Sequence, residues 1–264
     1  MNIGVITGSG FYDFDEADKL KQKTEITEYG KADIAEIPYG NHKIYFIARH
    51  GKNHSLLPNM INYRANITAL KNNSVKLIIG TSIMGILDPN LPLSTLLLFN
   101  DIYFPENRLP SGEPCTFFTK SGDPNRGHYI FSSPFSTKAN EIACKTAISI
   151  GVEYYDGFTH CHAIGPRFNS KSEIAMFRSI GCSTISQTVC PEIILAGESE
   201  IAYCLLGFGV DYANGVMEQP TPVEVLNANM QKSKSVFKTM VTGMVDRLDK
   251  ETTLYDKGFI YRFE

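Results

Sequence analysis

Short apolar runs, each bounded by turn residues, recur along this chain and alternate with segments of helical periodicity. Runs of this length are typical of strands buried on both faces of a sheet, and their alternation with helices is typical of α/β folds. No repeat, low-complexity stretch or linker divides the chain, so we expect one domain spanning residues 1–264. The expected strands cover residues 3–7, 43–48, 76–81, 95–104, 184–188 and 201–208.

Helical periodicity is found at residues 59–72, 137–150 and 170–180, and Ser170 and Glu173 fit a capping box at the start of the third segment. Near the C-terminus, apolar residues recur every three to four positions after two prolines, so one stripe of a long helix should face the core. Segment 105–127, rich in Pro, Gly, Ser and Asn, is expected to be irregular. The stripe comprises Val223, Leu226, Met230, Phe237, Met240, Met244 and Leu248.

Charge and hydropathy exclude several kinds of partner. The 25 Lys and Arg residues against 28 Asp and Glu residues give a formal net charge of −3, without the basic field that attracts nucleic acid. No stretch approaches the roughly 20 apolar residues of a membrane span, and no basic, cleavable leader precedes the first apolar run. We therefore expect a cytoplasmic protein that binds neither nucleic acid nor membrane.

The cysteines resemble neither a disulfide framework nor a zinc site, because no CxxC pair is present in this long chain. Most should be buried thiols, and the pattern leaves open whether any of them pair. In the cluster His160-Cys161-His162, strand alternation would place the cysteine on the face opposite the two histidines, so we expect no metal there. The six are Cys115, Cys144, Cys161, Cys182, Cys190 and Cys204.

The first expected strand ends in Thr7-Gly8-Ser9-Gly10, where glycines allow close approach of a ligand to the backbone. Taken alone, this motif fits a phosphate-binding turn and a turn without a ligand about equally well. A dinucleotide site is disfavoured, because its third glycine is replaced by Asp13, an anion that would face the pyrophosphate.

The second strand ends in Arg49-His50-Gly51-Lys52-Asn53-His54. This sequence places a permanent cation and two imidazoles beyond the carboxyl end of a strand, where α/β sheets bind ligands. Arg49 could hold an oxyanion with two donors and His50 could add a third. The alternative is a solvated basic loop.

Taken in order, these motifs resemble those of the methylthioadenosine and purine nucleoside phosphorylases. The Gly-Ser-Gly turn and the Arg-His-Gly-x-x-His element are followed by Asn-Tyr-Arg-Ala-Asn at residues 62–66. Residues 165–168 are similar to the family's Gly-Pro-x-Phe element, and residues 185–192 to its Met-Thr-x-x-Pro-Glu segment. Pro134-Phe135 and Val210-Asp211-Tyr212 also match in order. The resemblance implies one nucleoside phosphorylase-like domain, with a central twisted mixed β-sheet flanked by helices.

The resemblance implies an orthophosphate site at the strand ends. The matching positions are Ser9, Arg49, His50, Ser82 and Thr188, with backbone donors at Ile83. Convergent cations, hydroxyls and amides are the groups that an oxyanion needs. The sequence departs from the family at residues 81–86, where Ile83 and Met84 replace smaller side chains.

The same resemblance implies a purine site. Phe168 matches the aromatic residue that stacks on the base, and Asp211 matches the acid at the purine N7 edge, which with His50 would be catalytic. A proton donor near N7 makes the base a better leaving group. Ala213 stands where 6-aminopurine enzymes usually carry a second acid, while Asp211 itself argues against a plain 6-oxopurine enzyme.

Further matches surround the expected sugar. Gln187 replaces a methionine beneath the ribose, and its amide could form a hydrogen bond with a ribose hydroxyl. His54 is placed near the sugar and phosphate. His128 would reach the 5′ pocket of a neighbouring subunit in a homotrimer or a hexamer of trimers. Val223, beside Pro222, would form the other wall of that pocket.

These residues predict phosphorolysis of a purine nucleoside, 5′-methylthioadenosine being favoured over inosine, guanosine or methylthioinosine. Orthophosphate would be the co-substrate, with no metal or organic cofactor. A nucleoside hydrolase and a noncatalytic purine-binding protein are the alternatives. Phosphate dependence separates the first from phosphorolysis, and binding without turnover would indicate the second.

Overall fold

The computed structural model describes residues 1–8, 21–249 and 252–263 of the chain. Ser9, which was expected to bind phosphate, lies outside these residues. The strands are β1 (Asn2–Thr7), β2 (Lys21–Thr27), β3 (Gly30–Tyr39), β4 (His42–Ala48), β5 (Leu77–Ile86), β6 (Leu96–Tyr103), β7 (Gly127–Phe131), β8 (Tyr154–His162), β9 (Thr184–Ser186), β10 (Ala202–Tyr212) and β11 (Gly258–Arg262). The α-helices are α1 (Tyr63–Asn72), α2 (Thr137–Ile150), α3 (Lys171–Ser179), α4 (Cys190–Glu198) and α5 (Val223–Val245).

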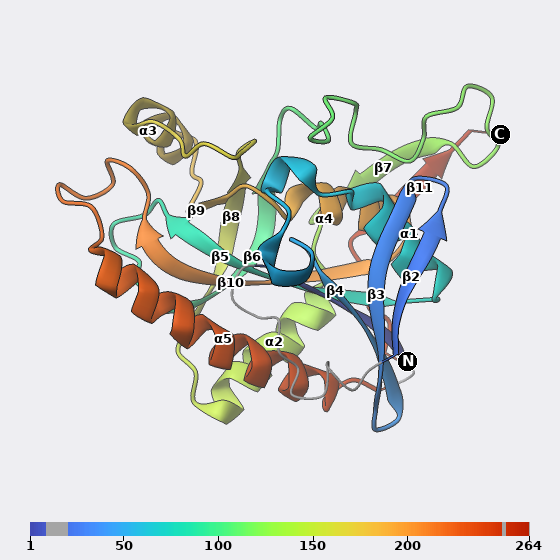
Figure 1. The fold of residues 1–264 in the computed structure, drawn as a ribbon, viewed down its shortest axis with the longest axis horizontal. Coiled ribbons are helices and arrows are strands. Elements are labelled where there is room, and N and C mark those ends of the chain that lie inside the picture. The colour runs from blue at the N-terminus through green and yellow to red at the C-terminus, as the bar shows by residue number, and fades with distance from the viewer. Residues whose placement is uncertain (9–20, 250–251, 264) are drawn as a thin grey trace.

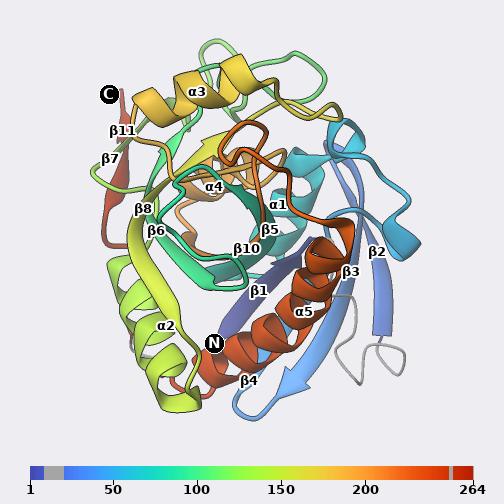
Figure 2. The same cartoon turned by 90° about the vertical axis from the view of Figure 1, so that its left-hand side faces the viewer.

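Within the described residues, nine strands form one sheet in the order β10-β6-β8-β9-β5-β1-β4-β3-β2. Strand β10 also pairs with β5, so the first five strands close into a barrel, which Figure 2 shows end-on as a ring. The pairs β1–β4, β1–β5 and β5–β10 are parallel, whereas β5–β9 and β6–β10 are antiparallel. The predicted mixed sheet flanked by helices is confirmed.

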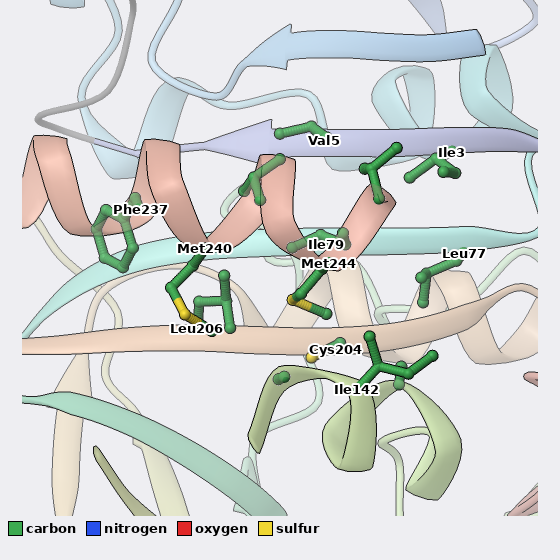
Figure 3. Close-up of a cluster of buried hydrophobic side chains, with 14 of the residues drawn as sticks. Ile3, Val5, Leu77, Ile79, Ile142, Cys204, Leu206, Phe237, Met240 and Met244 are labelled. Carbon is green, nitrogen blue, oxygen red and sulfur yellow. The ribbon is translucent and has the colours of Figure 1, made fainter. Parts of the chain in front are cut away.

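Two helical layers cover the sheet. Helices α2 and α5 lie on one side, and α1 and α4 lie on the other (Figure 1). Figure 3 shows Phe237, Met240 and Met244 of α5 packed with Ile79 and other strand residues in a buried cluster. Burying each such side chain contributes about 1.5–3 kcal/mol, so this packing fixes α5 across β5 and β10.

The predicted helices agree with the structure in part. Helix α2 spans the predicted range, and α3 begins with the expected capping box at Ser170 and Glu173. The apolar stripe of α5 is buried from Phe237 onward, but its first residue, Val223, is 65% exposed. Helix α4 was missed, because its residues were considered only as part of the phosphorylase-like motif.

Two further expectations concerned membrane-spanning helices and the state of the cysteines. No helix among the described residues is long and apolar enough to cross a membrane. The six cysteines are free thiols, and five of them are buried.

Candidate active site

A cavity of about 670 Å³ lies at the carboxyl ends of β1, β4, β5, β9 and β10, and helix α5 forms one wall. This volume is within the usual range for small-molecule sites, and the edge is the one at which α/β sheets bind ligands. Nine residues that the sequence predicted for phosphate or nucleoside binding line this single cavity. They are Arg49, His50, His54, Ser82, Ile83, Phe168, Gln187, Thr188 and Asp211.

Gly8 forms the rim of the cavity at the end of β1. A Cβ at this position would lie 2.8 Å from Nη1 of Arg49 and 3.3 Å from the carbonyl oxygen of Thr81. A side chain would therefore displace the arginine, which explains a glycine here. Ser82 and Thr188, both buried, add hydroxyl groups to the same end of the cavity.

Arg49 is fully buried in an ion pair with Glu192 of α4. Its Nη2 donates to Oε2 of Glu192 at 2.9 Å, and its Nη1 donates to the Thr81 carbonyl at 2.9 Å. Tyr203 of β10 donates its hydroxyl hydrogen to the same carboxylate at 2.8 Å. Burial lowers the pKa of Arg49, but Glu192 outweighs burial and raises it above its usual value. The cation therefore lies beneath the cavity with its charge already compensated.

Glu192 is a functional neighbour that the sequence motifs did not predict, although it ends the segment 185–192 that resembles the family's Pro-Glu element. Local periodicity in the sequence cannot indicate that a buried carboxylate lies next to the arginine that was expected to bind phosphate. Arg49 and Glu192 are 143 positions apart in sequence and become neighbours only when the end of β4 meets α4.

His50 is buried, and its ring stacks on His54 with 4.3 Å between centroids. Its Nδ1 lies 2.9 Å from the carbonyl oxygen of Leu56. Burial, together with the neighbouring Arg49, lowers the pKa of His50 to about 4. His50 is therefore neutral at pH 7.

A β-bulge directs Asp211 into the cavity. The register between β10 and β5 shifts between Gly209 and Asp211, so that Asp211 pairs with Gly85. Burial raises the pKa of Asp211 to about 6. About a tenth of this carboxyl group therefore keeps its proton at pH 7, far more than an ordinary aspartate does, and a general acid must carry a proton.

The end of the cavity near Asp211 extends into a smaller hollow of about 70 Å³, lined also by Ala213 and Asn214. Phe168 borders both spaces and is 80% exposed. The segment carrying Phe168 is held by two neighbours: Arg167 pairs with Glu173 at 2.7 Å, and Nε2 of Gln187 donates to the Arg167 carbonyl at 2.8 Å. A flat ligand beside Asp211 would cover the exposed ring.

Gln187, which was expected to contact the ribose, makes a structural hydrogen bond. Its side-chain amide binds the segment that carries Phe168 while the residue also lines the cavity. A Cβ at Gly165 would overlap the Gln187 side chain, which accounts for glycine in the Gly-Pro-Arg-Phe sequence. Sequence analysis assigned Gln187 to the sugar alone, because the hydrogen bond to residue 167 depends on the fold.

Two predicted residues lie away from this cavity. Val223 is the first residue of α5 and points to solvent; Leu226 and Met230, one and two turns further on, line the wall instead. Val223 does not line the cavity of the single chain, so its expected place in the wall of a shared 5′ pocket stays a prediction. His128 is exposed on β7, 5.4 Å from the ring of Phe263, and its expected contact with a neighbouring subunit remains a prediction.

The His160-Cys161-His162 cluster supports strand β9. His160 lies 2.9 Å from Thr184 Oγ1 and 3.0 Å from Ser186 Oγ, and Nδ1 of His162 lies 3.1 Å from the Thr188 carbonyl. Burial lowers the pKa of His160 to about 3 and that of His162 to about 4. Within the described parts of the chain, no three potential metal-ligating side chains gather in one place.

Together, the fold and the cavity define an α/β protein with one pocket that is lined by a buried cation, an imidazole, hydroxyl side chains, a protonatable acid and an exposed aromatic ring. Residues 2–246 match the model of the phosphorylase superfamily. The chain therefore belongs to the phosphorylase superfamily, and the resemblance found in the sequence is confirmed.

Individual relatives fall into more than one group. The chain is 33% identical over 248 residues to the 6-oxopurine nucleoside phosphorylase of Pyrococcus furiosus, covering 92% of this chain and 91% of that protein. It is 28% identical over 268 residues to the S-methyl-5′-thioadenosine phosphorylase of Danio rerio, covering 96% and 92% of the two chains. The structure of methylthioadenosine phosphorylase from Schistosoma mansoni with adenine superposes with a TM-score of 0.81 at 23% identity, covering 93% of this chain and 91% of that one. This likeness shows the shared fold.

Proposed function

We propose that this protein catalyses phosphorolysis of a purine nucleoside, releasing the free base and a ribose 1-phosphate. One observation carries the proposal: a single cavity holds His50, Ser82 and Thr188 at one end and Asp211 with Phe168 at the other. A nucleoside placed between them would have its base at Asp211 and its anomeric carbon directed to the phosphate. The relatives named above as nucleoside phosphorylases support this reading.

In the proposed reaction, a phosphate oxygen attacks the anomeric carbon through an oxocarbenium-like transition state. The new C–O bond forms as the bond from C1′ to N9 breaks, and the electron pair passes to the purine. Protonated Asp211 transfers its proton to the leaving base, and the bound phosphate stabilises the developing positive charge of the sugar. We propose that orthophosphate is the co-substrate and that the reaction uses no metal or organic cofactor.

The favoured substrate is 5′-methylthioadenosine. Leu57 and, on α5, Leu226 and Met230 give part of the cavity wall an apolar character that suits a methylthio group better than a hydroxyl. The same helix also brings Asn227, Gln231 and Lys234 to the lining. A 6-oxopurine nucleoside or methylthioinosine is the second candidate. It is favoured by the absence of a carboxylate at Ala213 and by the neighbouring amide of Asn214, whose Nδ2 donates to the Asn169 carbonyl at 2.8 Å.

We further propose a homotrimer, or a hexamer of trimers, in which His128 reaches the neighbouring subunit's 5′ pocket, and a role in purine salvage in the cytoplasm. Analytical ultracentrifugation of the full chain tests the assembly, since a monomer at assay concentrations would contradict it.

The substrate is tested by incubating the purified protein with methylthioadenosine, adenosine, inosine, guanosine and methylthioinosine, each with and without phosphate. Free base is followed by chromatography. We expect the fastest release from methylthioadenosine, in the presence of phosphate only. Faster release from inosine or methylthioinosine would select the second candidate, and purine binding without release from any nucleoside would indicate a noncatalytic protein.

Replacing Phe168 with alanine is expected to raise KM for the nucleoside by about 5- to 150-fold, the equivalent of the 1–3 kcal/mol that stacking contributes per base. KM for phosphate should change little, because the ring lies at the other end of the cavity. Phe168→Tyr should retain most of the affinity. The matched control is Phe259→Ala, which removes another exposed ring outside the cavity; equal effects of the two alanine variants would contradict the assignment.

Replacing Leu226 with glutamine is expected to lower the preference for methylthioadenosine over adenosine by about 10-fold or more in kcat/KM. An apolar pocket discriminates by roughly 1–3 kcal/mol per methylene-sized group, and the added amide favours the hydroxyl. Steady-state kinetics with both nucleosides measures the ratio. An unchanged ratio would show that α5 does not contact the 5′ group.

A further inference from the structure

The protonation of His50 is fixed by a backbone contact. Its Nδ1 lies 2.9 Å from the Leu56 carbonyl oxygen, which can only accept a hydrogen bond, so Nδ1 must carry a hydrogen. A neutral imidazole has one such hydrogen, and the other nitrogen, Nε2, is then a bare acceptor. His50 lines the cavity, and with its one hydrogen engaged by Leu56 the neutral ring has no N–H left to donate to an oxyanion there.

The surroundings of His50 disfavour a permanent imidazolium. The ring is buried, lies next to Arg49 in sequence and stacks on the ring of His54 at 4.3 Å. The carboxylate nearest to Arg49, that of Glu192, is already bonded to the guanidinium and to Tyr203. The remaining titratable groups that line the cavity are Asp211 on β10 and Lys234 on α5. Among the described residues, no carboxylate is hydrogen-bonded to the His50 ring.

We infer that an oxyanion binds here only with one hydrogen shared between it and Nε2 of His50, and that this requirement selects hydrogen-bearing oxyanions. Phosphate and arsenate keep a P–OH or As–OH group at neutral and mildly alkaline pH, so they bring this hydrogen with them. Sulfate carries none, so it must bind together with a proton from solvent. The inference deepens the proposed function and rests on it, because it concerns the co-substrate of the same site.

The reaction balances with this arrangement. As the new C1′–O bond forms, HPO₄²⁻ gives its hydrogen to Nε2 of His50, and Asp211 gives one to the purine as the bond to N9 breaks. The products are the neutral base and the ribose 1-phosphate dianion, with His50 protonated and Asp211 ionised. Transfer of one proton from His50 to Asp211 through solvent restores the starting state.

The test is calorimetric titration of the full chain with phosphate, arsenate and sulfate, separately, between pH 7 and pH 9. We expect the Kd of sulfate to rise about tenfold for each pH unit, because one proton must be taken up with it. The Kd of phosphate and that of arsenate should change less than about threefold over the same range. His50→Gln, which offers an amide donor in place of the bare nitrogen, should make sulfate binding independent of pH. Asp33→Asn, on the β2–β3 hairpin outside the cavity, should keep the slope.

The outcomes distinguish failure of the proton requirement from failure of the proposed function. Equal and pH-independent binding of sulfate and phosphate, or the same slope in His50→Gln, would overturn the proton requirement and leave the proposed function standing. Absence of binding by any of the three anions would overturn both. Because His50→Gln could fail to fold, ring ¹⁵N NMR of the wild-type protein gives a second readout: Nε2 of His50 should be unprotonated without anion and protonated with sulfate. An Nε2 that is protonated before anion is added would contradict the inference.

Discussion

Replacing Asp211 with asparagine is expected to lower kcat by about 10²- to 10⁴-fold, the range that a positioned general acid contributes. The asparagine side chain has the same size and can still donate a hydrogen bond to N7, but it cannot transfer a proton. The wild-type enzyme should lose activity as pH rises through the pKa of Asp211, about 6 in the free protein, because the acid is then ionised. Steady-state kinetics from pH 5 to 9 should show this alkaline limb in the wild type and not in the variant.

The same substitution is expected to stabilise the fold at neutral pH. Burial raises the pKa of Asp211 from 3.8 to about 6, so the folded state binds the proton more tightly than the unfolded state does. The wild-type protein therefore loses stability as pH rises between about 4 and 6, by roughly 2–3 kcal/mol when fully ionised. Urea unfolding should show Asp211→Asn to be the more stable protein at pH 7, with a smaller difference at pH 4.

Loss of activity with a gain in stability would identify Asp211 as a residue kept for chemistry. A variant that is both inactive and less stable would indicate a structural role instead. Full activity in the variant would remove Asp211 from the mechanism. Asp33→Asn, which changes an aspartate bonded to Thr24 on the β2–β3 hairpin, is the matched control and should alter neither kcat nor its pH profile.

Replacing Glu192 with glutamine is expected to cost about 3–5 kcal/mol of unfolding free energy, because it leaves the charge of Arg49 buried and unpaired. The pair lies under the cavity with no exposed side-chain surface. Tyr203→Phe removes only one hydrogen bond to the same carboxylate and should cost about 1–3 kcal/mol. Chemical denaturation at pH 7 measures both.

The double variant Arg49→Met/Glu192→Leu separates stability from function. Replacing both charges by apolar side chains removes the unpaired ion, so we expect the double variant to be more stable than Glu192→Gln. It should nevertheless bind phosphate poorly, because the cation beneath the cavity is gone. A loss of less than about 1 kcal/mol in Glu192→Gln, or normal use of phosphate by the double variant, would contradict this account of Arg49.

Local patterns predicted the fold class because they depend on near neighbours in sequence. Six apolar runs identified β1, β4, β5, β6, β9 and β10 of the nine-stranded sheet, and a capping box identified the start of α3. No strand range was predicted for β2, β3, β7, β8 or β11, because none of these segments contains a long continuous apolar run. The closure of the barrel by pairing of β10 with β5 joins residues more than 100 positions apart, and no local pattern encodes it.

The cavity was predicted by family resemblance more than by spacing. Resemblance brought Phe168, Thr188 and Asp211 into one site, and all three line the same cavity. It did not predict that Gln187 would hold the segment carrying Phe168, or that Arg49 would be paired with Glu192. Both contacts depend on tertiary structure. Resemblance also placed Val223, the first residue of α5, in the wall of the 5′ pocket, whereas Leu226 and Met230 are the α5 residues of the apolar stripe that line the cavity.

The central claim is that phosphate, and not water, is the nucleophile. It is tested most directly by identifying the sugar product by ³¹P NMR after incubation of the protein with methylthioadenosine or inosine in phosphate buffer. We expect a new phosphate monoester signal that grows in step with free purine and is absent without enzyme. Release of purine with free sugar, and with inorganic phosphate unchanged, would show hydrolysis and contradict the account.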